Sequence, residues 1–246
     1  MMHAVRPDPE SEKYRVLKGI FGFDGFRPGQ EVVVDAILSG RNALAVMPTG
    51  SGKSLCFQLP ALVRGGLTVV VSPLVALMQD QVAALKLAGV RAATINSAKD
   101  RAENVAIWRS VAAGEIDLLY LSPERLMTER MLSAIGKLPL SFLVVDEAHC
   151  ISQWGASFRP EYDALARLRD IFPNVPIAAF TATADQVTRL DIAEKLFRSD
   201  VRQRGHHGRH HCFRHGHRQA GRALRATHGH AGQRRGLLSG IRPRRT

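Results

Sequence analysis

The stretch AVMPTGSGKSL, residues 45–55, decides the fold of this chain. It follows a short apolar run and precedes a helical pattern, and it is a short form of the phosphate-loop sequence, opening with Pro-Thr instead of glycine. Glycines let backbone N–H groups curl around an anion, and the helix N-terminus adds a positive dipole. The candidate nucleotide-binding residues are Thr49, Gly50, Ser51, Gly52, Lys53 and Ser54. The alternative is an ordinary strand-to-helix turn that contains Gly-Lys-Ser.

Two of these residues have distinct expected roles. Lys53 should reach the β- and γ-phosphates of a nucleotide, and the hydroxyl of Ser54 should ligate magnesium. The sequence therefore predicts that a nucleotide and Mg²⁺ bind together at this loop.

The stretch FLVVDEAHC, residues 142–150, supplies the second part of a nucleotide site. A carboxylate at the C-terminal end of a strand in a parallel sheet points into the ligand crevice. Asp146 should hold magnesium, usually through water, and Glu147 should orient and deprotonate the attacking water. With Lys53, these two acids are the catalytic candidates. The alternative is a pair of acids that merely closes a strand.

Residues 13–200 alternate between β-rich runs and helical stretches, after an N-terminus of residues 1–12 that we expect to be flexible. The β-rich runs are residues 42–47, 67–71, 116–121, 142–146 and 176–181. Helical stretches with apolar residues at three- and four-residue spacing include 74–89, 100–114 and 184–197. This alternation predicts an α/β fold with a central, mostly parallel sheet flanked by helices.

The charge is divided unevenly along the chain. The net charge is +12, from 34 Lys and Arg against 22 Asp and Glu. Residues 201–246 hold 12 Arg and no Lys, Asp or Glu, so the first 200 residues balance 22 basic against 22 acidic residues. We therefore expect a neutral globular body followed by a separate cationic tail.

Membrane and secretory classes are not supported. No apolar run approaches the roughly 20 residues that span a bilayer, and MMHAVRPDPESEKY at the start has no apolar signal-peptide core. The three cysteines, Cys56, Cys150 and Cys212, are odd in number and scattered, which favours a reduced compartment. We expect a cytoplasmic protein with no membrane partner.

The motifs together resemble a known family. GSGKS with DEAH resembles superfamily 2 helicases, and FGFDGFRPGQ (21–30) with CISQWGASFRPEY (150–162) narrows the resemblance to the RecQ family of DNA helicases. It covers about residues 14–200, the first of that family's two RecA-like lobes. The resemblance implies an ATP-dependent DNA helicase that acts in repair or recombination, with ATP and Mg²⁺ as cofactors and single-stranded or forked DNA as partner.

FGFDGFRPGQ looks like the family motif that holds adenine. The resemblance places Phe26 and Arg27 near the base and has Gln30 hydrogen-bonding its edge. The alternative is a helix start with an aromatic staple, which can hold at the same time.

Three further motifs resemble the family's DNA-facing elements. VSPLVALMQDQ (71–81) and YLSPERL (120–126) would contact phosphates without reading sequence, and FTATA (180–184) would link the nucleotide site to DNA. The DNA-binding candidates from these motifs are Ser72, Gln79, Ser122, Thr181 and Thr183. Buried helix starts, and a strand end with a helix N-cap, are the alternatives.

ISQWGASFRPEY, residues 151–162, looks like the family's aromatic-rich loop. Trp154 and Phe158 can stack on unpaired bases at about 1–3 kcal/mol per base, and Arg159 can bind a phosphate or a stacked base. The family commonly has His-Asp before the phenylalanine, where this chain has Ala156-Ser157. The alternative is that both aromatic residues belong to the core.

The stretch RGHHGRHHCFRHGHRQAG, residues 204–221, leaves three interpretations open for the tail. Its histidines could bind a metal, although the spacing matches no structural zinc pattern. Its arginines could form a cationic arm with salt-dependent attraction to phosphate, although the lack of Lys is odd for one.

The third interpretation is a frameshift. Codons exist for residues 216–221 that read G-I-D-K-P-D one nucleotide later, and codons for 237–246 that read Y-Y-Q-E-S-G-R-A-G-R. Both strings resemble second-lobe motifs of the RecQ family, in the family's order, and the second includes its arginine finger.

We therefore interpret residues 201–246 as a disordered, out-of-frame remnant. An arginine finger contributes a factor of about 10³–10⁵ in rate, so a chain without the second lobe should unwind little or nothing. The family's zinc-binding region is likewise not expected. An inactive nucleotide- and DNA-binding remnant is the alternative to an active helicase.

Overall fold

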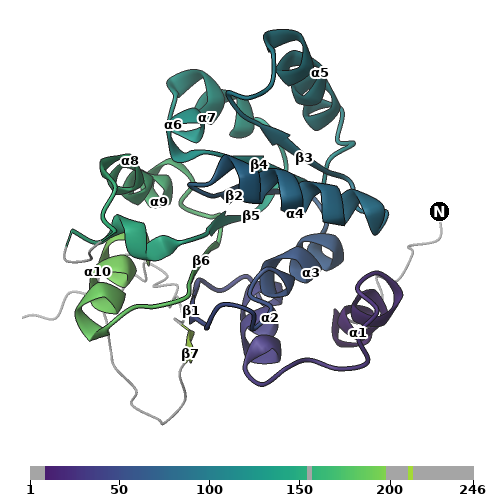
Figure 1. Cartoon of the computed structure of the whole chain (residues 1–246), viewed down its shortest axis with the longest axis vertical. Helices are drawn as coiled ribbons and strands as arrows, with labels where there is room; N and C mark the ends of the chain where they lie inside the picture. Colours follow the sequence, from purple (N-terminus) through teal and green to yellow (C-terminus); the bar gives the residue numbers. More distant parts are fainter. Residues whose placement is uncertain (1–8, 154–156, 198–209, 213–246) are drawn as a thin grey trace, which may run out of the picture. The chain divides into compact units, whose positions relative to one another are not determined.

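A computed structural model describes residues 9–153, 157–197 and 210–212 (Figure 1). Its centre is one sheet with the strand order β3-β4-β2-β5-β6-β1-β7. The strands are β1 (Ala43–Val46), β2 (Leu67–Val71), β3 (Ala92–Ile95), β4 (Leu118–Leu121), β5 (Leu140–Val145), β6 (Ile177–Thr181) and β7 (His210–Cys212). Strands β1 to β6 pair in parallel, and β7 pairs antiparallel with β1. The predicted α/β fold with a mostly parallel sheet is confirmed.

Helices connect the parallel strands. The longer ones are α1 (Pro9–Gly19), α2 (Gln30–Leu38), α3 (Leu55–Arg64), α4 (Val75–Leu87), α5 (Arg101–Ala112) and α10 (Gln186–Phe197). Short ones are α6 (Pro123–Leu126), α7 (Glu129–Ile135), α8 (Pro160–Asp163) and α9 (Leu168–Ile171), with 3-10 turns η1 (Ala148–Ile151) and η2 (Ala164–Arg167). No helix in the described ranges is both long and apolar enough to cross a membrane.

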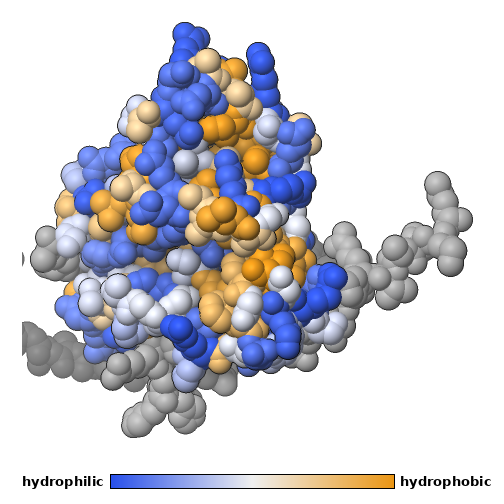
Figure 2. All heavy atoms as spheres, turned by 45° about the vertical axis from the view of Figure 1, so that its right-hand side comes forward, coloured by the Kyte–Doolittle hydropathy of each residue, from blue (hydrophilic) through white to orange (hydrophobic). Residues whose placement is uncertain are grey.

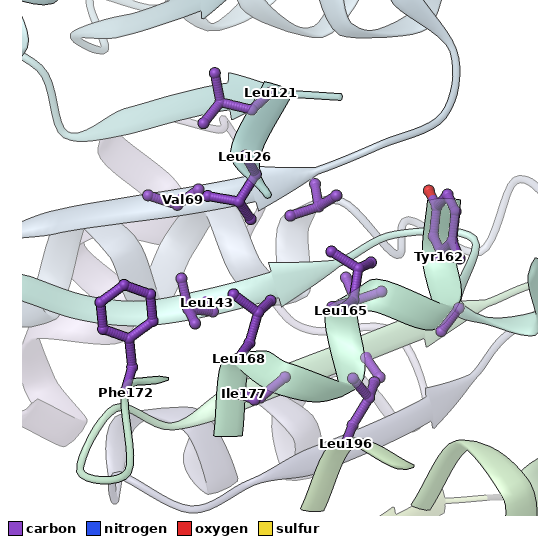
Figure 3. Packing of buried hydrophobic residues seen from close by; sticks show 14 of the residues in the cluster. Val69, Leu121, Leu126, Leu143, Tyr162, Leu165, Leu168, Phe172, Ile177 and Leu196 are labelled. Atoms are coloured by element: carbon purple, nitrogen blue, oxygen red, sulfur yellow. The ribbon is translucent and has the colours of Figure 1, made fainter. Parts of the chain in front are cut away.

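The two faces of the sheet bury separate cores, because side chains alternate along a strand. On β2, Val69 and Val71 belong to one core and Val70 to the other. The first core is filled by residues of α6 to α10, including Leu165, Leu168 and Leu196 (Figure 3). The second is filled by α1 to α4. Because helices cover both faces of the sheet, the two ends of the strands are the places left open to a ligand.

Local sequence explains several element boundaries. Asp100 and Glu103 form a capping box that starts α5, and Thr128 caps α7 by accepting from the N–H of Met131. Strand β3 was not predicted, because AATI is short and half alanine, which is depleted in strands. Its place at the sheet edge comes from pairing with β4.

A few residues of each predicted terminal segment are described. Residues 9–12, predicted to be flexible, form the start of α1, with Pro9 in a position that suits the first turn of a helix. Residues 210–212 of the predicted disordered tail form β7. A sheet edge accepts an extended segment through backbone hydrogen bonds, largely independently of its side chains. Residues 1–8, 198–209 and 213–246 lie outside the described part of the chain.

Candidate nucleotide site and DNA-facing edge

The predicted site residues converge at one edge of the sheet. The phosphate loop follows β1, Ser72 follows β2, Ser122 follows β4 and Asp146 follows β5. All these strands run parallel, so their carboxyl ends meet at the same edge. In open α/β sheets, ligands bind in the crevice at this edge.

The phosphate loop makes a tight turn between β1 and α3. Gly50 and Gly52 have φ of 78° and 80°, a left-handed conformation that favours glycine. Ser51 closes the turn, since its N–H and its hydroxyl both donate to the carbonyl of Pro48, at 3.1 and 2.6 Å. The ammonium of Lys53 donates to the carbonyl of Met47 at 3.3 Å, which folds its side chain back over the loop. Lys53 thus lies over the loop at which it is expected to bind phosphates.

Gln30 lies beneath this loop and is 2% exposed. Its Nε2 donates to the carbonyls of Ser51 and Gly52, at 3.0 and 3.2 Å, and its Oε1 accepts from the N–H of Arg27 at 2.9 Å. The Arg27 guanidinium donates to the carbonyl of Gly50 at 2.9 Å. These two predicted adenine-binding residues therefore hold the phosphate loop in this structure.

The two phenylalanines of the same motif differ in exposure. Phe26 is half-buried, packs on the second core and contacts the ring of Tyr14 at 5.6 Å between centroids. Phe23 is 46% exposed. The family resemblance points to Phe26 and not to Phe23, and the spacing of the motif does not tell which ring is exposed. Exposure distinguishes a packing ring from one that is available for stacking on a ligand.

Asp146 is the buried acid of the site, with 5% exposure. Its Oδ1 accepts from the N–H of Glu147 at 2.9 Å, and its own N–H donates to the carbonyl of Val71. Burial raises the pKa of Asp146 to about 6, and the charge of Glu147 adds to the rise. The hydrogen bond from the backbone N–H of Glu147 and the positive charge of Lys53 lower the pKa of Asp146. Lys53 and Asp146 thus interact electrostatically within one site.

Glu147 has a left-handed backbone, with φ of 49° and ψ of 43°. No other non-glycine residue in the described ranges has a positive φ. Such a conformation costs on the order of 1–3 kcal/mol and occurs often at functional sites. The hydroxyl of Tyr162 supports the turn by donating to the carbonyl of Asp146 at 3.1 Å (Tyr162 is labelled in Figure 3).

His149 joins the acid pair to the end of β6. Its Nδ1 lies 2.8 Å from Oγ1 of Thr181 and 3.3 Å from Oε2 of Glu147. The Thr181 hydroxyl donates to the carbonyl of Thr183 at 2.9 Å, so its single proton is committed there. Nδ1 of His149 is therefore within reach of both Thr181 and Glu147. Neither His149 nor Tyr162 was among the predicted site residues, although His149 stands within the DEAH motif.

Two of the predicted DNA contacts occupy structural positions. Ser72 is 1% exposed, and its hydroxyl has no hydrogen-bond partner among the described residues. The hydroxyl of Ser122 caps α6 by accepting from the N–H of Arg125 at 3.4 Å. For Ser122 the arrangement matches the alternative of a helix start, whereas Ser72 is buried ahead of the N-cap Leu74 of α4 and caps nothing.

The other described residues that are predicted to contact DNA are more accessible, with the exception of Thr181. Gln79 on α4, Thr183 and Arg159 are exposed, and Phe158 is half-buried. Thr181 is fully buried and belongs to the His149 contact. Trp154 lies outside the described residues.

A cavity of about 600 Å³ lies away from these motifs, at the amino ends of the strands. Gly66, Arg91 and Asp117, which line it, precede β2, β3 and β4. Figure 2 brings that side of the molecule forward and shows hydrophobic surface among charged residues. The cavity is not part of the nucleotide site, since the phosphate loop is at the opposite edge.

The described residues hold no group of three or more His, Cys, Asp or Glu side chains that could bind a metal by themselves. Most histidines of the tail lie outside the described ranges. A magnesium ion at the nucleotide site would instead share protein ligands with a nucleotide, as Mg²⁺ usually does.

The fold and site define a RecA-like nucleotide-binding lobe of the phosphate-loop type. Residues 27–190 match the sequence model of the DEAD/DEAH box helicase family, and the chain belongs to that family. Over this lobe its homology is to the RecQ-type DNA helicases.

Two bacterial relatives are each named ATP-dependent DNA helicase RecQ, from Pasteurella multocida and Haemophilus influenzae. Each is 49% identical over 181 residues, which cover 74% of this chain and 29% of the relative. The probable ATP-dependent DNA helicase RecS of Bacillus subtilis is 43% identical over 183 residues, 36% of its length. The chain thus spans about a third or less of the length of these relatives.

Solved structures share the fold. The DEAD-box helicase Mss116 bound to ssRNA and UDP-BeF aligns with a TM-score of 0.60 at 20% identity, over 74% of this chain and 40% of that one. The DUF1998 helicase MrfA bound to DNA aligns with a TM-score of 0.58 at 21% identity, over 78% and 29%.

Proposed function

We propose that this lobe binds ATP with Mg²⁺ and hydrolyses ATP in response to DNA, as the first lobe of a RecQ-type helicase motor. One observation carries the proposal: the phosphate loop and the buried Asp146 follow parallel strands β1 and β5, whose carboxyl ends lie at the same edge of the sheet. The relatives' names, ATP-dependent DNA helicases, agree with this reading. A cytoplasmic location is part of the proposal, in keeping with the free Cys56 and Cys150.

The residues fit the triphosphate and its metal. Lys53 would exchange its contact with the Met47 carbonyl for phosphate oxygens, and the left-handed glycines would leave the loop amides facing the anion. The Ser54 hydroxyl and the Asp146 carboxylate are the oxygen ligands that Mg²⁺ prefers. When bound, magnesium would neutralise charge on the β- and γ-phosphates.

Glu147 is the proposed base for the attacking water. Its left-handed backbone, and Nδ1 of His149 at 3.3 Å from Oε2, would hold the carboxylate in place at the carboxyl ends of the strands. The same imidazole contacts Thr181 of the FTATA motif. If DNA displaced the FTATA motif, the imidazole of His149 would therefore transmit the displacement to Glu147.

DNA is proposed to run along the carboxyl edge of the sheet. Gln79, Thr183, Phe158 and Arg159 are the accessible candidates there, and Trp154 is retained as a stacking candidate. The preferred partner is single-stranded or forked DNA, by analogy with the relatives.

Unwinding by the described lobe on its own is proposed to be weak or absent, because translocation needs two lobes that move relative to each other. The other candidate is a nucleotide- and DNA-binding remnant without helicase activity. The out-of-frame origin of residues 201–246 stays part of this proposal. Sequencing the coding DNA tests it: a frame one nucleotide later that does not resemble a second lobe refutes the frameshift.

The activity is tested with the purified 246-residue protein and forked DNA. We expect ATP binding and a weak, DNA-dependent ATPase that Lys53→Ala abolishes, with no strand separation. Robust unwinding refutes the remnant interpretation. Failure to bind ATP refutes the assignment of the site.

A further inference from the structure

The peptide unit between Asp146 and Glu147 joins the two acids of the nucleotide site. Asp146 is tied to the sheet, because its N–H donates to the carbonyl of Val71, the last residue of β2, at 2.9 Å. Glu147 comes after this bond and has the left-handed backbone, with φ of 49°. The backbone of Asp146 is therefore set by the sheet, whereas the backbone of Glu147 depends on how the peptide unit is oriented.

Both polar groups of this peptide unit are hydrogen-bonded. Its N–H, which belongs to Glu147, donates to Oδ1 of Asp146 at 2.9 Å. Its carbonyl, which belongs to Asp146, accepts from the hydroxyl of Tyr162 at 3.1 Å. The first bond is local to the acid pair, whereas the second comes from α8, 16 residues further along the chain. Rotation of the peptide unit would misalign both bonds, so Tyr162 opposes relaxation of the left-handed turn.

The ring of Tyr162 is held by the core. It is fully buried and packs in the first core, where Figure 3 shows it among the other buried side chains. Its own N–H donates to the carbonyl of Arg159 at 2.9 Å, at the start of α8. Because a closely packed interior restricts a ring to one rotamer, the hydroxyl is presented to the acid pair at a fixed point.

The other side of Glu147 is fixed by the 3-10 turn that follows. The carbonyl of Glu147 accepts from the N–H of Cys150 in η1 at 2.9 Å. A non-glycine residue keeps a left-handed backbone only where its surroundings hold it there. With η1 on one side and Tyr162 on the other, the Glu147 side chain starts from a defined backbone.

We propose that Tyr162 is a positioning residue for hydrolysis, whose hydroxyl holds the Asp146–Glu147 peptide unit so that the Glu147 carboxylate stays aimed at the attacking water. The catalytic part rests on the proposed ATPase, whereas the hold on the turn needs no ligand. Lys53 in its loop and Asp146 on the sheet are anchored by other contacts. Loss of the hydroxyl should therefore slow the turnover of bound ATP and leave ATP affinity in place.

The role is tested in the full chain with Tyr162→Phe, which deletes the hydroxyl and keeps the ring. Tyr120→Phe is the matched control, because Tyr120 is also fully buried and its hydroxyl accepts from Nε2 of Gln58, at 3.2 Å, instead of holding the acid pair. In the presence of single-stranded DNA, we expect Tyr162→Phe to lower kcat for ATP about tenfold. Its KM and its stoichiometry of ATP binding should stay within about twofold of the parent. Tyr120→Phe should match the parent in all three quantities.

Two further measurements distinguish positioning from a general loss of structure. Hydrogen exchange at the Glu147 amide should rise about threefold or more in Tyr162→Phe and stay unchanged in Tyr120→Phe. In a Glu147→Gln background, adding Tyr162→Phe should not lower the residual ATPase further, because the carboxylate that Tyr162 positions is already gone.

An unchanged kcat in Tyr162→Phe, or an equal loss in Tyr120→Phe, overturns the positioning role. A further tenfold loss in the Glu147→Gln background does the same. Unchanged exchange at the Glu147 amide overturns the hold on the turn.

Cooperative thermal unfolding shows whether Tyr162→Phe is folded. If it is not, Glu147→Gly is added to it, since glycine adopts the left-handed turn without support. We expect the double variant to regain a cooperative transition, and its failure to do so overturns the hold on the turn. A parent chain with no ATPase fails the proposed function instead, and exchange at the Glu147 amide still decides whether Tyr162 holds the turn.

Discussion

Gln30 donates hydrogen bonds from one amide nitrogen to the backbone of the phosphate loop, at 3.0 Å from the carbonyl of Ser51. The same nitrogen also reaches the carbonyl of Gly52. A buried side chain from the start of α2 therefore shapes the anion-binding turn before any nucleotide arrives.

Replacing Gln30 with glutamate should disrupt this arrangement. A carboxylate cannot donate to the two loop carbonyls, and a buried group left without partners costs about 1–3 kcal/mol. We expect Gln30→Glu to weaken ATP binding and lower the melting temperature, as measured by nucleotide titration and thermal unfolding. Gln186→Glu, at an exposed glutamine, is the control and should change neither. Unaltered ATP affinity in Gln30→Glu would show that the loop holds its shape without this side chain.

Gly50 and Gly52 offer a matched pair of alanine substitutions. Both have left-handed backbones, so each alanine carries a similar conformational cost of about 1–2 kcal/mol. A Cβ at Gly52 would lie 2.5 Å from Nε2 of Gln30, whereas one at Gly50 meets nothing within 4 Å. We expect Gly52→Ala to weaken ATP binding more than Gly50→Ala, by about tenfold for the roughly 1.4 kcal/mol of added clash.

The clash can be relieved by a second substitution. Gln30→Ala should recover part of the ATP affinity lost in Gly52→Ala, and none of that lost in Gly50→Ala. Equal effects of the two glycine substitutions would contradict the contact with Gln30. Nucleotide titration of the four variants measures both outcomes.

The buried Asp146 should make the metal-free protein less stable as the pH rises. Its pKa is about 6 in the folded chain and about 3.9 in an unfolded one. Between these values the folded state binds the proton and the unfolded state does not, so the free energy of unfolding falls as pH rises from 4 to 6. Over this pH range the free energy of unfolding falls by about 2–3 kcal/mol.

Asp146→Asn removes this titration and keeps a side-chain oxygen for the N–H of Glu147. In EDTA at pH 7.5, we expect the variant to be more stable than the parent, with the difference shrinking as the pH falls below 6. Denaturant unfolding across this pH range is the measurement. A difference that does not vary with pH would contradict the raised pKa.

Alanine substitutions of Phe23 and Phe26 should distinguish a ring that contacts the ligand from a ring that packs in the fold. Phe23→Ala removes an exposed ring, so it should weaken ATP binding while leaving the melting temperature nearly unchanged. Phe26→Ala removes a half-buried ring in contact with Tyr14, so it should destabilise the fold, by less than the roughly 3–5 kcal/mol of a fully buried phenylalanine. Binding of ATP and of inorganic triphosphate, compared for both variants, tests whether Phe23 contacts the base. Equal weakening of both ligands by Phe23→Ala would exclude that contact.

The parallel sheet and its nucleotide-binding edge were predictable from local sequence. Apolar runs of strand length between helical patterns leave few other folds, and a phosphate loop after the first strand orients the sheet. Strand β3 was missed, because Ala92–Ile95 has weak strand propensity and owes its conformation to β4.

The roles of individual side chains were less predictable. Ser72 and Ser122 are predicted DNA contacts, and the sequence did not show that one hydroxyl is buried and the other caps a helix. Phe26 is predicted to meet adenine, and the sequence did not show that it is half-buried while Phe23 is exposed. Exposure depends on packing between elements that are distant in the chain, which sequence spacing does not contain.

The sequence by itself determined which chemistry the chain carries. The loop that ends in Lys53 and Ser54, and the acid pair Asp146–Glu147, can be read locally because a phosphate loop and a strand-end carboxylate depend on adjacent residues. Only the tertiary structure decided which residues support that chemistry. Gln30 beneath the loop and His149 beside Thr181 make contacts across 21 and 32 residues of chain, and such contacts exist only once the elements have packed together.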